Sequence, residues 1–217
     1  MGLPWARIVN ALREHLGSSP LPSVSQIARS DLTPFHILVS TMISLRTKDE
    51  VTLAASERLF GAAQSPAGML ALSEDRIAEL IYPAGFYRTK AGNIRKVCRV
   101  LLERHGGQVP ADIDELVALP GVGRKTANLV LGLGFGIEAI CVDTHVHRIA
   151  NRCGWVNSRN PDETERMLAE ILPGQHWIAI NELLVAYGQR VCTQTSPRCS
   201  SCVIAWQCDR VGVERSR

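Results

Sequence analysis

Four cysteines lie close together near the C-terminus, at the spacing C-x6-C-x2-C-x5-C: Cys192, Cys199, Cys202 and Cys208. Four thiolates in one short loop of a protein that we expect to be cytosolic indicate a metal ion or an iron–sulfur cluster. Structural zinc sites usually pair two C-x2-C units, and this loop contains one. Iron–sulfur loops tolerate less regular spacing. The spacing by itself leaves zinc and [4Fe–4S] both open.

A glycine turn precedes a helical pattern in the stretch LPGVGRKTANLV. The turn runs from Leu119 through Gly121 and Val122 to Gly123. Backbone N–H groups at the start of a helix attract anions, so this turn predicts a contact with phosphate. A plain connection between two helices is the alternative.

Lys125 follows the turn at the start of the helical pattern. The P-loop motif requires glycine immediately before its lysine, and Arg124 occupies that place. A surface lysine that holds a phosphate is the simpler interpretation. The other is a nucleophile, which reacts only as the neutral amine, and both Arg124 and the helix dipole favour that form.

Asp143 lies eighteen residues beyond Lys125, in the stretch VDTHVHRIANRCGW. An aspartate in this position is expected to cap the helix that follows. A capped carboxylate stays ionised, so it could also stabilise positive charge on a sugar or assist proton transfer. His145 could contact a phosphate or orient Asp143, and its spacing of two from His147 is poor for a shared metal site on a helix.

Basic residues are concentrated between residues 85 and 105, where six Lys or Arg residues accompany one acidic residue. The stretch GFYRTK places aromatic Phe86 beside Arg88 and Lys90. A solvated helix face is one interpretation of this pattern. The other is a nucleic-acid surface on which Phe86 inserts as a wedge between stacked bases.

The composition is that of a globular protein of one or two domains: 217 residues, 46% hydrophobic, 21% charged, with a net charge of +3. No apolar run is long enough to predict a membrane span. The first residues predict an amphipathic helix with Ile8, Leu12 and Leu16 on one face, not a signal peptide. We therefore expect a cytoplasmic protein without a membrane partner.

Helical periodicity recurs along most of the chain, and no convincing alternating strand is found. Glycine and proline punctuate the pattern, so we expect an all-α protein of around ten short helices. The clearest helices are expected at 91–102, 124–135, 144–153 and 176–187, with two more between Phe35 and Phe60.

Together, LPGVGRKTANLVL, VDTHVHRIANRCGW and the cysteine loop resemble the endonuclease III family of DNA glycosylases over nearly the whole chain. The resemblance implies two helical domains with an interdomain cleft, a helix-hairpin-helix motif and a C-terminal iron–sulfur loop. One domain would hold residues 28–137, and the other would join 1–27 to 138–217.

Carried over by position, the resemblance makes Lys125 and Asp143 the catalytic pair and the four cysteines the ligands of a [4Fe–4S] cluster. It implies a bifunctional DNA glycosylase/AP lyase of base excision repair. Such an enzyme removes oxidised pyrimidines and cuts 3′ to the abasic site by β-elimination through a lysine Schiff base. The implied partner is double-stranded DNA with damaged or abasic sites, bound by a monomer that works on the bacterial nucleoid.

Arg46 departs from the family, which usually has a glutamine here to fill the gap left by the flipped base. Arginine carries a permanent charge and more donors, so we expect a changed preference for the opposite base. Arg46 pointing into solvent is the alternative. A thymine- or uracil-mismatch glycosylase, or a non-catalytic DNA-binding module stabilised by a metal, would also fit parts of the sequence.

Overall fold

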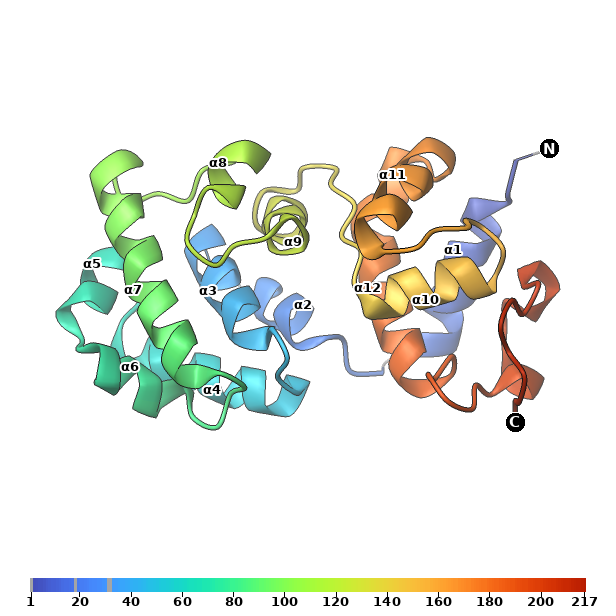
Figure 1. Cartoon of the computed structure of the whole chain (residues 1–217), viewed down its shortest axis with the longest axis horizontal. Coiled ribbons are helices and arrows are strands. Elements are labelled where there is room, and N and C mark those ends of the chain that lie inside the picture. Colours follow the sequence, from blue (N-terminus) through green and yellow to red (C-terminus); the bar gives the residue numbers. More distant parts are fainter. Residues whose placement is uncertain (1, 18, 31–32) are drawn as a thin grey trace. The chain divides into compact units, whose positions relative to one another are not determined.

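The computed structural model describes residues 2–17, 19–30 and 33–217, which form helices and turns without a strand. The all-α class predicted from periodicity is thereby confirmed for these residues. Contacts divide the chain into two units (Figure 1). One unit comprises 1–21 and 138–217, and the other comprises 22–137.

The unit of residues 22–137 is built around α3 (Pro34–Ser44). Every residue of α3 from Phe35 to Ile43 is buried, because α2, α4, α7 and α9 pack around it. Helix α7 also packs on α5 and α6, and α8 leads through a hairpin into α9 (Figure 1). The bounds are α2 (Ser23–Ala28), α4 (Asp49–Ala62), α5 (Pro66–Ala71), α6 (Glu74–Ile81), α7 (Tyr87–Arg104), α8 (Ile113–Val117) and α9 (Arg124–Phe135).

The second unit packs α12 (Trp177–Arg190) against α1 (Trp5–Leu16) and α10 (Thr144–Arg152). Helix α11 (Pro161–Ile171) contacts α10, and three short 3-10 helices complete the unit: η1 (Gly174–His176), η2 (Cys199–Ser201) and η3 (Ala205–Gln207). Trp5 and Trp155 meet edge to face, with ring centroids 5.0 Å apart. The predicted face of Ile8, Leu12 and Leu16 is buried in this core.

Helix α9 begins and ends at the predicted residues, because a glycine turn precedes it and Gly136 ends it in the left-handed conformation. Helices α2, α5 and α6 had no strong sequence signal, since they span only one or two turns. Contacts place the first boundary between units at residues 21 and 22. The sequence had placed this boundary near residue 28. The two boundaries differ by helix α2, which packs on α3 and α4 and so belongs to the unit of residues 22–137.

None of the helices in the described ranges is long and apolar enough to cross a membrane.

Candidate functional site

The hairpin between α8 and α9 turns tightly and leaves its glycines at the surface. Leu119 and Val122 are buried, and the Val122 N–H donates to the Leu119 carbonyl at 3.1 Å. Their side chains therefore anchor the hairpin, and only its backbone faces solvent. Gly121 and Gly123 are exposed, as a backbone contact with phosphate requires.

Gly121 has a φ of +77°, which L side chains rarely adopt. A Cβ at this position would also lie 2.6 Å from the amide nitrogen of Asn93 on α7. Glycine is thus required by both the backbone and the packing against α7. Gly123 differs, since its φ is −95° and a Cβ would meet nothing within 4 Å.

Lys125 is the second residue of α9 and is exposed. The residues that follow it, Thr126, Ala127 and Asn128, are buried in the unit. The helix therefore turns these residues inward and presents Lys125 beside the hairpin at its N-terminal end. An exposed amine in this place can reach a bound nucleic acid.

Asp143 is the N-cap of α10. Its Oδ1 accepts hydrogen bonds from the backbone N–H groups of His145 at 2.8 Å and Val146 at 2.9 Å. The side chain is half-buried. These two bonds orient the carboxylate, as sequence predicted for the cap.

His145 belongs to a network that ties the start of α10 to the cysteine loop. Its Nδ1 lies 3.0 Å from an Nη of Arg148, which also donates to the carbonyls of Gly188 and Cys192. A Cβ on Gly188 would lie 2.6 Å from His145 Nδ1. Burial lowers the pKa of Arg148, and the charges of Cys192 and Asp143 oppose that shift.

Arg46 and Phe86 lie together on the other unit. The guanidinium carbon of Arg46 is 5.5 Å from the centroid of the Phe86 ring. Both residues have positive φ, 54° and 56°, and Phe86 is 63% exposed. Arg88 is exposed and places its guanidinium 5.5 Å from the Tyr87 ring.

The basic stretch 85–105 is not one charged surface. Lys90 is buried, and its ammonium donates to the carbonyls of Ile43 and Leu45 and to the Thr47 hydroxyl. Burial lowers the pKa of Lys90 to about 8. Arg95 donates to the Leu70 carbonyl at 3.2 Å. These two cations hold the fold, and exposed Arg88 remains available to a ligand.

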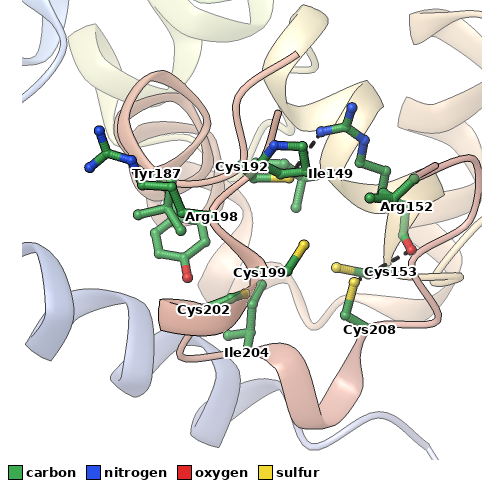
Figure 2. Close-up of a pocket in the computed structure, with 13 residues that line it drawn as sticks. Ile149, Arg152, Cys153, Tyr187, Cys192, Arg198, Cys199, Cys202, Ile204 and Cys208 are labelled. Carbon is green, nitrogen blue, oxygen red and sulfur yellow. Dashed lines mark hydrogen bonds between the residues drawn. The ribbon is translucent and has the colours of Figure 1, made fainter. Parts of the chain in front are cut away.

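The four cysteines of the C-terminal loop line one pocket (Figure 2). All four are half-buried and free of disulfides. Arg152 approaches Cys192 Sγ to 3.5 Å and also donates to the Thr193 carbonyl. Within the described ranges, no group of three or more His, Cys, Asp or Glu side chains is arranged to hold a metal ion.

Cys153, which lies outside the predicted four-cysteine motif, is a fifth thiol in this pocket (Figure 2). It ends α10, and a hydrogen bond from it lowers the pKa of Cys208 to about 6. A backbone hydrogen bond from the Asp209 N–H to the Cys153 carbonyl, at 3.4 Å, holds Cys153 and Cys208 close together. Gly154 permits this approach, since a Cβ there would collide with the Asp209 carboxylate.

The predicted residues thus fall into two groups. Residues 22–137 contain the hairpin, Lys125, Arg46, Phe86 and Arg88, whereas Asp143, His145 and the cysteines belong to the other unit. Sequence reasoning overlooked the supporting residues Lys90, Arg148 and Arg152. The burial of these residues depends on the tertiary structure. The only sign of it in the sequence was a basic residue at an apolar position of a helix.

Comparison with known proteins gives a family match over residues 39–174, described as "HhH-GPD superfamily base excision DNA repair protein". The chain is 46% identical over 176 residues to a Thermotoga maritima protein named endonuclease III, covering 81% of this chain and 83% of that protein.

Two solved structures resemble this protein over 96% of its chain at 32% identity. One is a non-covalent endonuclease III–DNA complex, with a TM-score of 0.84 and 96% of its chain covered. The other is a trapped endonuclease III–DNA covalent intermediate described as an estranged-adenine complex, with a TM-score of 0.83 and 97% covered.

Proposed function

The chain belongs to the HhH-GPD superfamily of base excision DNA repair proteins, and from this premise we propose a bifunctional glycosylase/AP lyase that uses Lys125 and Asp143. Similarity to endonuclease III over more than four fifths of both chains supports DNA glycosylase and AP lyase activity. The observation that carries the proposal is the exposed lysine at the second position of α9, directly after the glycine hairpin.

Lys125 is the proposed nucleophile. A damaged pyrimidine is flipped out of the duplex, which exposes C1′ of its deoxyribose. Neutral Lys125 then forms a bond from Nζ to C1′ while the bond from C1′ to the base breaks, and the base leaves with a proton. Ring opening gives an imine, which acidifies the C2′ proton. Loss of that proton expels the 3′ phosphate by β-elimination and cuts the strand 3′ to the abasic site.

Asp143 is proposed to act on the same sugar when DNA is bound. Its carboxylate stabilises the positive charge that develops on the deoxyribose as the base departs. It also accepts a proton, which assists formation of the neutral amine. The two backbone hydrogen bonds to Oδ1 support this role because they fix the orientation of the carboxylate.

The remaining predicted residues are proposed to hold DNA. Backbone N–H groups of the hairpin from Leu119 to Gly123 bind a phosphate, and Arg88 and His145 contact the strand. Phe86 enters the base stack and Arg46 faces the base left unpaired. The preferred partner is double-stranded DNA with a damaged or abasic site, bound by one copy of the chain. The solved DNA complexes of similar fold support DNA binding.

A [4Fe–4S] cluster is the proposed cofactor, held by Cys192, Cys199, Cys202 and Cys208. Four free thiols facing one pocket provide its donor set. Resemblance to endonuclease III over more than four fifths of both chains favours the cluster over zinc. Bound there, the cluster would hold the loop in place. Arg148 and Arg152 would offset its negative charge.

The Lys125→Ala variant tests the catalytic assignment. With duplex DNA carrying an abasic site, borohydride should trap a covalent adduct with the wild-type protein and none with the variant. A trapped adduct of unchanged yield in Lys125→Ala would refute the assignment. Arg124→Ala is the matched control, since it removes the adjacent exposed cation but keeps the amine.

The cofactor is tested separately by the visible spectrum and iron content of the protein purified without oxygen. A brown protein with broad visible absorbance is expected, and colour should be lost in Cys202→Ser. Stoichiometric zinc without iron would overturn the cluster.

A further inference from the structure

Arg46 and Phe86 are held in place from several directions. They lie on separate loops, and each adopts the left-handed backbone conformation that non-glycine residues rarely take. Such residues persist only where the surrounding structure determines them, and they concentrate at functional sites. The cation–π contact of 5.5 Å joins their side chains outside the core. The question is which residue imposes this arrangement.

Lys90 binds both loops. Its backbone N–H donates to the Phe86 carbonyl at 3.0 Å, the first hydrogen bond of α7. Its ammonium donates to the carbonyls of Ile43 and Leu45 at 2.6 Å each and to Thr47 Oγ1 at 2.8 Å. The three acceptors surround Arg46 in sequence. A cation is suited to this place because Ile43 and Leu45 lie at the C-terminal end of α3.

Two further contacts close the same turn. The Gly85 N–H donates to Thr47 Oγ1 at 3.0 Å. A Cβ on Gly85 would lie 2.4 Å from the Arg46 carbonyl oxygen. The loop that carries Phe86 therefore lies directly against the backbone of Arg46, and only glycine allows that approach.

We propose that Lys90 is a positioning residue that fixes Arg46 against Phe86, so that the two side chains select the base opposite the lesion as one unit. The inference rests on the proposed function and adds to it how the site reads the second strand. Lys90 is buried and does not touch DNA itself. The pair presents an aromatic face for stacking and a cation with only hydrogen-bond donors.

Guanine is the expected preferred opposite base. Its O6 and N7 are two neighbouring acceptors, which match the donors of a guanidinium. Adenine offers the acceptor N7 beside a donor amino group, so it can accept a hydrogen bond from only one N–H group of the guanidinium. Lesions derived from cytosine stand opposite guanine, and these form the substrate class that the pair would favour.

The test measures single-turnover strand cleavage of abasic-site duplexes with each of the four bases opposite, together with a single-stranded abasic oligonucleotide. Wild type should cleave the guanine duplex about tenfold or more faster than the slowest duplex, the ratio of one good base contact. Lys90→Met should bring that ratio close to one and leave single-strand cleavage unchanged. Lys96→Met, which changes an exposed lysine on the same helix, should keep the wild-type ratio.

A double variant separates positioning from general stability. If Lys90 acts through Arg46, the Lys90→Met/Arg46→Gln pair should have the same ratio as Arg46→Gln alone. Should Lys90→Met fail to fold, Thr47→Val removes the hydroxyl that accepts from both Lys90 and Gly85 and should lower the same ratio. An equal loss on all substrates, including the single strand, would overturn the proposal, as would a wild-type protein indifferent to the opposite base.

Failure of this inference is distinct from failure of the proposed function. The trapping experiment on Lys125 uses a lesion whose opposite base is held constant. Its result therefore stands whatever the Lys90 variants do.

Discussion

Helices α9 and α10 each have a proposed catalytic residue at their N-terminal end, yet the backbone N–H groups of their first turns are satisfied differently. Helix α9 begins after Gly123, and no side chain of the described residues caps it. Helix α10 begins after Asp143, whose carboxylate accepts two of its backbone N–H groups. The first arrangement leaves a helix N-terminus to attract an external anion. The second uses that N-terminus to hold an internal carboxylate.

This difference explains why the two residues need such different surroundings. Under the proposed function Lys125 would meet the substrate, and it stands exposed beside the hairpin proposed to bind phosphate. Asp143 would act through a fixed orientation, and it is half-buried and tied to the backbone of His145 and Val146. In this proposal one helix start serves binding, and the other serves electrostatic preorganisation.

The largest effect on activity is expected from substitutions of Asp143, which separate its role as a helix cap from its proposed role in catalysis. Asparagine caps a helix about as well as aspartate, so Asp143→Asn should unfold near the wild-type temperature. It lacks the charge, and base release should slow by roughly 10²–10⁴-fold. Asp143→Ala should show the same slow rate and lose about 1 kcal/mol of stability as well. Full activity in Asp143→Asn would reduce the residue to a cap.

Removal of the proposed cluster should affect α10 and spare α9. The C-terminal end of α10, at Arg152 and Cys153, lines the cysteine pocket. Cluster loss should therefore speed hydrogen exchange of α10 amides by about tenfold or more, a change of about 1.4 kcal/mol. Amides of α9 should exchange as before. Equal acceleration in both helices would show that the cluster supports the whole chain.

Gly121→Ala tests the hairpin at Gly121, which has positive φ, whereas the other hairpin glycine does not. The substitution should cost about 1–3 kcal/mol, because alanine is strained in this conformation and its methyl group presses on Asn93. DNA affinity should fall on every sequence alike. The Gly121→Ala/Asn93→Ala variant relieves the collision only, so partial recovery measured by thermal unfolding is expected. Complete recovery would contradict the role of φ.

The smallest effect on stability is expected for an aspartate at position 123, which would give α9 the kind of N-cap that α10 has. Gly123→Asp meets no steric obstacle and should change stability by only a few tenths of a kcal/mol. Its carboxylate would occupy the place of the DNA phosphate and weaken binding. Gly123→Ser adds a neutral cap and should bind better than Gly123→Asp at low salt. Equal affinities for the two would argue against a phosphate at this helix start.

Several local features were predictable because they depend on neighbouring residues alone. The bounds of α9 follow from a glycine turn and a closing glycine, and the cap at Asp143 follows from its place before Thr144. The common pocket of the cysteines follows from their short spacing. The roles of Lys125 and Asp143 in catalysis remain predictions.

Other features could not be predicted, since they join residues distant in sequence. Lys90 reads as part of a basic surface, but the end of α3 and the loop that follows it supply three acceptors to its ammonium. Arg148 reads as an exposed helical residue, but the Cys192 carbonyl draws it inward at 2.8 Å. Arg46 offers no sequence signal for its positive φ or for the close approach of Gly85 to its carbonyl oxygen.

The sequence by itself determined the all-α class, the main helices and the cap at Asp143, because periodicity, caps and turns are local. The tertiary structure alone decided which cations are buried, which glycines are indispensable and that Arg46 rests on Phe86. Those outcomes depend on which backbone carbonyls and rings come within bonding distance, and the chain sets these distances only when its distant segments pack together.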